Sequence, residues 1–81
     1  MAKLYLEIIA KDKVLVRDEV DMVEACGTLG EFGILPGHIQ FFTTLEPGEI
    51  RYIKGGKVNV ISAGAGFAEV IGDRVTILVE A

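Results

Sequence analysis

Short runs of alternating apolar and polar residues, separated by turn-forming residues, make up most of this chain. In the first run, Leu4, Leu6 and Ile8 would lie on one side of an extended strand, because successive strand side chains point to opposite faces. Gly55-Gly56 and Gly72-Asp73 have the composition of tight hairpin turns. Nowhere do apolar residues recur at helical spacing over a useful length. The sequence therefore predicts an all-β fold, an antiparallel sandwich or barrel.

The same pattern places the remaining strands and some of their irregularities. A strand is expected to begin at 14–16 and continue from 18 to 25, with Val20 and Met22 on one face. Phe41 and Phe42 should point to opposite faces, which predicts that one of them is in the core. The small residues of 62–66 predict a bulge or a close approach of two backbones. Further strands are expected over 4–9, 39–45, 50–53, 58–61, 67–71 and 74–79.

Composition narrows the class of protein and of partner. The 81 residues suit one domain, and 51% hydrophobic against 25% charged residues argues against disorder. The net charge of −4, with dispersed basic residues, makes nucleic acid and anionic lipid poor partners. No apolar run approaches the roughly 20 residues of a membrane span, and no secretory signal is recognisable, so direct membrane insertion is not expected. The single cysteine, Cys26, fits a reducing, cytoplasmic compartment.

One stretch, from Gly30 to His38, interrupts the alternation. It holds three glycines, a proline and the only histidine, and it reads Gly-Glu-Phe-Gly-Ile-Leu-Pro-Gly-His. Glycine reaches backbone angles that other residues avoid, whereas proline fixes φ, so this composition predicts a shaped loop. A shaped and partly apolar loop either closes the end of a core or meets a partner.

Signals for chemistry are sparse. His38 is the first candidate for acid–base work because only its unperturbed pKa lies near neutrality, but no motif links it to Cys26 or to an acid. Gly64-Ala65-Gly66 is not followed by a helix signal, which argues against a phosphate-binding loop. No metal or cofactor site is expected. A domain that binds a small molecule, or catalyses a reaction with His38, stays open as the alternative to a non-catalytic binding domain.

The stretch from Gly30 to His38 is also similar to a motif of a known protein family. It resembles the signature loop of the epsilon subunits of rotary, F-type ATP synthases, and Thr43 follows it at the family's spacing. Further similarity lies in 20–23, in Leu-Glu-Pro-Gly-Glu-Ile-Arg at 45–51, in Gly-Phe-Ala-Glu-Val at 66–70 and in Val-Thr-Ile-Leu at 75–78. These motifs occur in the family's order over nearly the whole chain.

The resemblance implies a fold and a role. The fold would be a flattened β-sandwich of two antiparallel sheets with about ten short strands, spanning 1–81 as the N-terminal domain of an epsilon subunit. The role would be that of a non-catalytic central-stalk subunit of a proton-translocating ATP synthase, on the cytoplasmic face of the cell membrane. Such a domain binds the gamma subunit and the c ring and couples their rotation to the catalytic head. The family's C-terminal helical hairpin is absent from this sequence, so its inhibitory and ATP-binding roles are not expected here.

The resemblance also implies two sets of contact residues. Glu31, Phe32 and Gly33 match positions that face the loops of the c ring. A second set matches positions that face gamma, namely His38, Ile39, Phe42 and Thr43. An isolated domain would expose both sets, so weak self-association through the surface from Glu31 to Thr43 is also expected.

Overall fold

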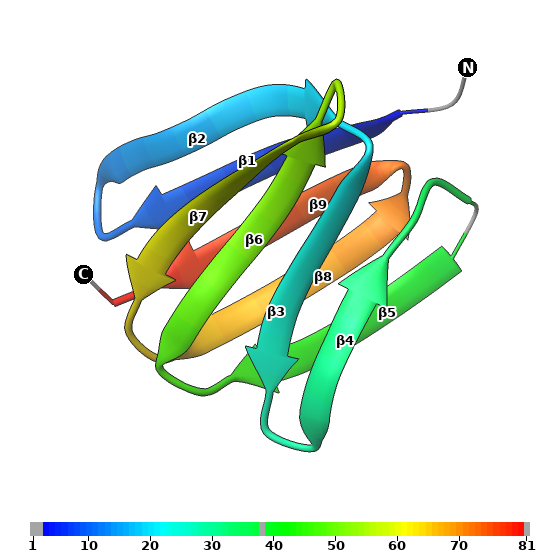
Figure 1. The fold of residues 1–81 in the computed structure, drawn as a ribbon. Coiled ribbons are helices and arrows are strands. Elements are labelled where there is room, and N and C mark those ends of the chain that lie inside the picture. Colours follow the sequence, from blue (N-terminus) through cyan, green and yellow to red (C-terminus); the bar gives the residue numbers. More distant parts are fainter. Residues whose placement is uncertain (1–2, 38, 81) are drawn as a thin grey trace.

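The described residues form nine strands packed in two layers (Figure 1). The computed structural model describes residues 3–37 and 39–80, without the side chain of residue 39. The strands are β1 (Leu4–Ala10), β2 (Lys13–Val20), β3 (Met22–Gly27), β4 (Gly30–Ile34), β5 (Ile39–Leu45), β6 (Gly48–Lys54), β7 (Lys57–Ala63), β8 (Gly66–Gly72) and β9 (Arg74–Val79). The expected all-β sandwich is therefore confirmed, with a strand count close to the expected ten.

The two layers are joined at one corner. One layer has five strands in the order β2-β1-β9-β8-β5, and the other has four in the order β4-β3-β6-β7. A single residue pair, Gly27 with Leu45, connects β3 to β5 and so links the layers. Neighbouring strands run antiparallel except β1 and β9, which lie parallel from the pair Tyr5–Arg74 to the pair Ala10–Val79. This parallel pair brings the first and last strands together in the middle of the five-stranded layer.

The core lies between the layers and follows from the alternation. Leu4, Leu6 and Ile8 are fully buried, as the sequence predicts, and their alternate neighbours face outward. The other buried apolar residues come from both layers and are Ala10, Val20, Val23, Ala25, Ile34, Leu45, Ile50, Ala68, Val70, Val75, Ile77 and Val79. No polar or charged residue of the described chain is buried.

Two predicted turns and one predicted close approach of two backbones are confirmed. Gly55 and Gly56 have φ of 58° and 80° and connect β6 to β7 as a two-residue hairpin loop. Gly72, with φ of 61°, and Asp73 connect β8 to β9 in the same way. At Gly66, a Cβ atom would overlap the carbonyl oxygen of Leu78, which is the expected close approach of two backbones.

The long strand expected through 18–25 is divided at Asp21. Val20 and Val23 are both fully buried although they are three positions apart, an odd spacing, so the alternation changes phase between them. Met22 faces outward, not the same way as Val20 as expected. The physical reason is that the chain leaves the five-stranded layer after β2 and enters the four-stranded layer as β3. Asp21 stabilises the chain where it passes between the layers, because its carboxylate accepts a hydrogen bond from the Gly55 amide at 2.9 Å.

The stretch from Gly30 to His38 is only partly a loop. Residues 30–34 form β4, which pairs with β3 from the pair Gly27–Gly30 to the pair Val23–Ile34. The alternation was hidden because glycine occupies one position on each face, Gly30 inward and Gly33 outward, leaving Phe32 and Ile34 to face the core. The prediction of a loop over the whole stretch is therefore wrong for 30–34. His38 lies outside the described residues.

Candidate partner-binding surfaces

The contact residues expected for the c ring lie on β4, but their side chains do not share one face. Glu31 and Gly33 are on the outer face of the four-stranded layer. Phe32 points inward and is half-buried, with its ring centroid 5.4 Å from that of Phe41 in an edge-on pair. This aromatic pair joins β4 to β5 across the side of the sandwich. Only Glu31 and Gly33 are therefore presented directly to a partner, whereas Phe32 supports the strand that carries them.

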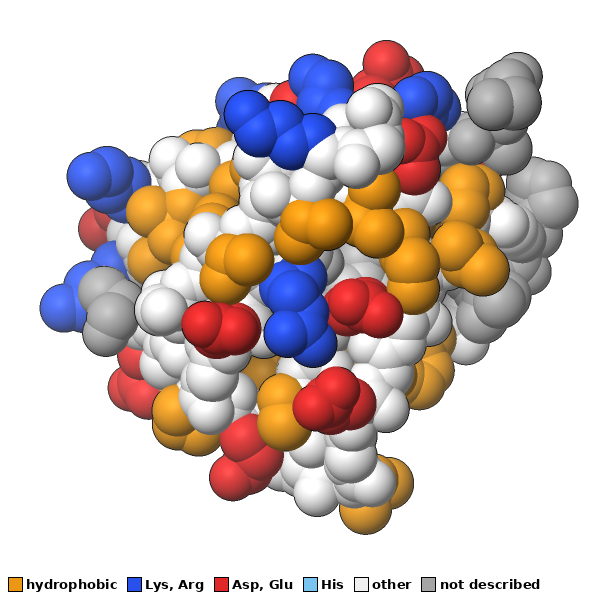
Figure 2. Space-filling model, viewed as in Figure 1, with side chains coloured by type: hydrophobic (Ala, Val, Ile, Leu, Met, Phe, Trp, Pro, Cys, Tyr) orange, Lys and Arg blue, Asp and Glu red, His pale blue; other side chains and the backbone are white. Residues whose placement is uncertain are grey.

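Glu31 belongs to a cluster of charges on this outer face, called the acidic patch, which consists of Glu24, Glu31, Glu49 and Arg51. The guanidinium of Arg51 lies between the three carboxylates, at 3.5 Å from Glu24, 3.9 Å from Glu31 and 3.8 Å from Glu49. Figure 2 shows acidic side chains around a basic one on this face. The Glu31 side chain is 75% exposed, so its ion pair with Arg51 is weak. Three carboxylates with one guanidinium leave the acidic patch negative and suited to a basic partner.

The contact residues expected for gamma lie on β5, in the other layer. Phe42 is on the outer face, opposite Glu69 of β8, and 61% of its area is exposed. Thr43 points inward and is half-buried opposite Ala68. His38 and the side chain of Ile39 are outside the described residues. Of this set, Phe42 is the residue that the structure shows open to a partner.

Phe42 is the centre of a second surface, the aromatic patch, which consists of Phe42, Phe67 and Ile71. The rings of Phe42 and Phe67 have centroids 5.5 Å apart, and Ile71 lies on the other diagonal from Phe42. Ile71 and Phe67 are 53% and 37% exposed. The expectation that Phe41 or Phe42 would be in the core is wrong, because β5 lies at the side of its layer, where Phe41 is also 39% exposed. Exposed aromatic residues that contact one another are typical of a protein interface.

The two patches therefore lie on opposite outer faces of the sandwich. Glu31 projects from the four-stranded layer and Phe42 from the five-stranded layer, with the core between them. The sequence alone did not reveal this separation, because the two residues are close along the chain. The alternation within β4 and β5 shows which side chains of each strand face outward. It places Glu31 and Phe42 on opposite faces only when the two strands are assigned to different layers.

A cavity of about 370 Å³ opens beside the Phe32–Phe41 pair, but its described lining carries no acid–base chemistry. The lining residues are Phe32, Gly33, Ile34, Leu35, Pro36, Phe41 and Val70. Within the described ranges, no group of three or more metal-ligating side chains is present. Residues 3–37 and 39–80 also contain no helix with the length and hydropathy of a membrane span.

Comparison with known proteins identifies the family. Residues 3–81 match the family model of the ATP synthase delta/epsilon chain β-sandwich domain. The chain belongs to this family. It is 45% identical to the ATP synthase epsilon chain of Geotalea daltonii and 47% identical to that of Nitratidesulfovibrio vulgaris, over 96% and 95% of its own length. These alignments cover 56% and 58% of the two relatives, so the chain spans little more than half of each.

Solved structures agree with this assignment. The chain superposes over its full length on 52% of a chain in the Euglena gracilis mitochondrial ATP synthase, in a structure containing OSCP, F1 and the c ring. The TM-score is 0.93 and the sequence identity 26%. A chain in the central stalk and c-ring structure of the Tetrahymena thermophila enzyme has a TM-score of 0.81 at 13% identity, which supports the fold alone. That match covers 98% of this chain and 64% of the other.

Proposed function

We propose that this chain is a non-catalytic subunit of the central stalk of a proton-translocating ATP synthase, where it holds the gamma subunit and the c ring together. Membership of the delta/epsilon β-sandwich family over residues 3–81 is the observation that carries this proposal. The stalk would lie at the cytoplasmic face of the cell membrane. A subunit that transmits torque needs a stiff fold and anchored contact surfaces, rather than an enclosed active site.

The acidic patch would bind the loops of the c ring. Glu31 is its most exposed described carboxylate, and the Arg51 guanidinium holds it only loosely. A basic group or an amide in a partner loop can therefore pair with Glu31 without first breaking a strong contact. Gly33 lies exposed on the same face as Glu31, with the end of the Met22 side chain packed beside it.

The aromatic patch would bind gamma. Phe42 exposes a large apolar area that loses contact with water when a partner covers it, and Phe67 keeps the ring in place. Apolar burial of this kind supplies affinity, whereas the exposed charges of the acidic patch contribute mainly specificity. His38, Ile39 and Thr43 complete the proposed gamma-binding set, and Phe32 supports the c-ring set from within the sandwich.

Reassembly of the rotary complex tests this function. The chain, with the Glu31→Lys and Phe42→Lys variants, is added to an ATP synthase preparation from which the corresponding subunit has been removed. Retention on the complex and ATP-driven proton pumping are then measured. We expect the wild-type chain to restore both, and each variant to lower both. Glu19→Lys is the control, because it makes the same change of charge as Glu31→Lys on β2, an exposed strand of the other layer. If both patch variants bound and restored proton pumping as well as the wild type, the proposed surfaces would be refuted. If the wild-type chain were not retained on the complex, the proposed function would be refuted.

A further inference from the structure

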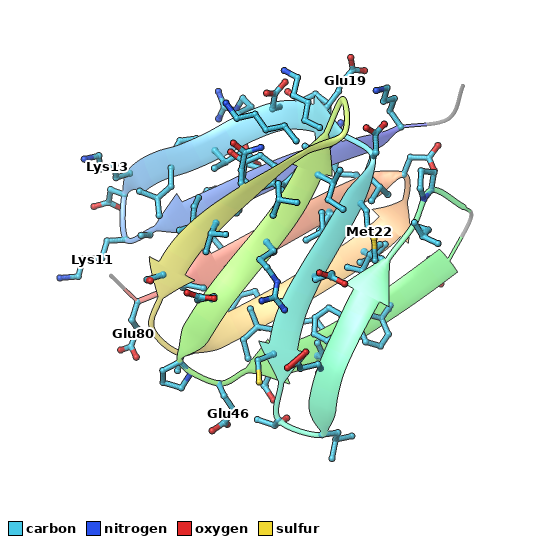
Figure 3. All side chains as sticks on the ribbon, in the orientation of Figure 1. Lys11, Lys13, Glu19, Met22, Glu46 and Glu80 are labelled. Carbon is cyan, nitrogen blue, oxygen red and sulfur yellow. The ribbon has the colours of Figure 1, made fainter. Side chains whose placement is uncertain are left out.

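The edge strands of the two layers differ in how well they are protected against pairing with another strand. β2 is an edge of the five-stranded layer and carries two common forms of protection. An extra residue, Leu15, makes a bulge in its pairing with β1. Four charged residues lie along it, Lys13, Arg17, Asp18 and Glu19, and the first and last of these are labelled in Figure 3. A second copy of a strand would pair poorly with this edge.

β4 is also an edge, but it offers little backbone to a partner. It has five residues, it begins at Gly30 with φ of 130°, and Pro36 follows two residues after its end. Short edge strands and nearby prolines limit edge-to-edge pairing. β4 is therefore the second protected edge of the sandwich.

β7 has none of these features. It has seven residues, pairs with β6 without a bulge, and contains no proline and only one charge, Lys57, at its first position. Val58 and Val60 project from its outer face with exposures of 55% and 50%, and β-branched residues favour strand pairing. Among the residues that the structure describes, no strand pairs with the outer edge of β7. Its row of peptide groups is open to an added strand.

The opposite layer does not shield this edge. The contact between the layers on this side is made by β2 with β6, where the Lys54 ammonium lies 2.6 Å from an Asp18 carboxylate oxygen. β7 lies one strand further out than β6. A second strand can therefore lie beside β7 without displacing β2.

We propose that β7 pairs edge to edge with β7 of a second copy of this chain. In the antiparallel arrangement centred on Val60, all seven residues of each strand find a partner. Val60 lies opposite Val60 of the second copy, Val58 opposite Ser62, and Lys57 opposite Ala63, so no like charges meet. The two four-stranded layers then form one continuous sheet. β5, the remaining edge strand, is already engaged at its C-terminal end, where Leu45 pairs with Gly27 and the Thr44 carbonyl accepts a hydrogen bond from the Thr28 amide.

The area involved sets the strength of this pairing. Stable interfaces bury roughly 1,200–2,000 Å², more than one pair of seven-residue edges supplies. We therefore expect a dissociation constant of roughly 0.1–1 mM, so the dimer forms only in concentrated solution. This interface differs from the surface between Glu31 and Thr43 that the sequence suggested for self-association. It also does not depend on the proposed role in ATP synthase.

Sedimentation velocity of the whole chain, from about 10 µM to about 2 mM, tests the proposal by spanning the expected dissociation constant. We expect the wild-type chain to dimerise with rising concentration. Val60→Lys and Val60→Glu each place like charges directly opposite one another at the two-fold axis, so each variant alone should stay monomeric. An equimolar mixture should dimerise again, because opposite charges then meet. Val60 faces outward, so both variants are expected to melt within a few degrees of the wild type.

Ile71→Lys is the matched control. Ile71 is exposed to a similar extent, 53%, but lies in the aromatic patch on the other layer, and its variant should dimerise like the wild type. A wild-type chain that stays monomeric throughout would overturn the proposal. Unchanged dimerisation of Val60→Lys would also overturn it, as would loss of dimerisation in Ile71→Lys alone, which would place the interface on the aromatic patch.

Discussion

Replacing Gly66 by alanine should destabilise the sandwich strongly, because there is no room for a side chain at that position. Gly66 lies between two strands and pairs with Leu45 of β5 and Val79 of β9. A Cβ atom there would overlap the carbonyl oxygen of Leu78 and lie 2.7 Å from the Cα of Val79. The atoms in the way belong to the backbone of a central strand, so they cannot be relieved by a change of rotamer.

The magnitude follows from the size of the chain. Overpacking costs typically about 1–3 kcal/mol, and a clash with backbone belongs at the upper end of that range. A chain of 81 residues has a free energy of unfolding of roughly 4–12 kcal/mol, so about 3 kcal/mol is a large part of it. For a domain of this length, 1 kcal/mol shifts the melting temperature by about 4–8 °C. We therefore expect Gly66→Ala to lower the melting temperature by roughly 12–24 °C.

Thermal unfolding followed by circular dichroism measures this shift, and Gly48→Ala is its control. Gly48 begins β6, and a Cβ atom there would have no neighbour within 4 Å. Alanine at Gly48 should be neutral or stabilise by up to about 1 kcal/mol, because it restricts the unfolded chain. If Gly66→Ala melted within two or three degrees of the wild type, a close backbone approach at Gly66 would not be a constraint on this fold.

Two further predictions concern the core and the response to acid. Ile77→Val removes one methylene from a fully buried side chain and should cost about 0.5–1.5 kcal/mol in urea unfolding, whereas Ile71→Val, at a half-exposed position, should cost less than about 0.5 kcal/mol. Equal costs would contradict the placement of the core. The hydrogen bond from Lys3, and then that from the Gly55 amide, lower the pKa of Asp21 below its ordinary value of 3.8. A lowered pKa in the folded state adds stability above 3.8 that is lost as the pH falls through the folded-state pKa. The melting temperature of Asp21→Asn should therefore fall less steeply than that of the wild type below about pH 4, and parallel curves would contradict this.

The strands with regular alternation could be predicted from the sequence. Leu4, Leu6 and Ile8 gave the inner face of β1 because one face of that strand is fully buried and the other is not. Gly55-Gly56 located a hairpin because few other residues accept the positive φ of both turn positions. The crowded position at Gly66 followed from the run of small residues around it.

The crossings between layers could not be predicted in this way. At Asp21 the chain changes layers with no glycine or proline to mark the break, so the alternating pattern looked continuous. At Gly30 to Ile34, glycine occupied one position on each face of a strand, and both glycines were interpreted as loop residues. The positions of Glu31 and Phe42 on opposite faces depend on β4 and β5 belonging to different layers, and sequence spacing does not reveal which layer a strand joins.

The pairing of β1 with β9 is the third feature that local pattern did not supply. Leu6 and Val75 are nearly at opposite ends of the chain, and their strands meet in parallel at the centre of one layer. β1 and β9 bury the same kinds of apolar side chain as the antiparallel strands do, so the residue pattern does not reveal the direction of a strand. The order of strands in a sheet is a property of the whole chain.

Binding of the chain to purified gamma subunit, in the absence of the c ring, tests the central claim that the two faces serve different partners. Covering Phe42, which is 61% exposed, is expected to contribute about 2–3 kcal/mol, so Phe42→Ala should weaken binding by roughly 30- to 150-fold. Glu31→Lys should change it by less than about threefold, since Glu31 lies on the opposite face. The account predicts this asymmetry. Loss of gamma binding in Glu31→Lys, with full binding by Phe42→Ala, would contradict it.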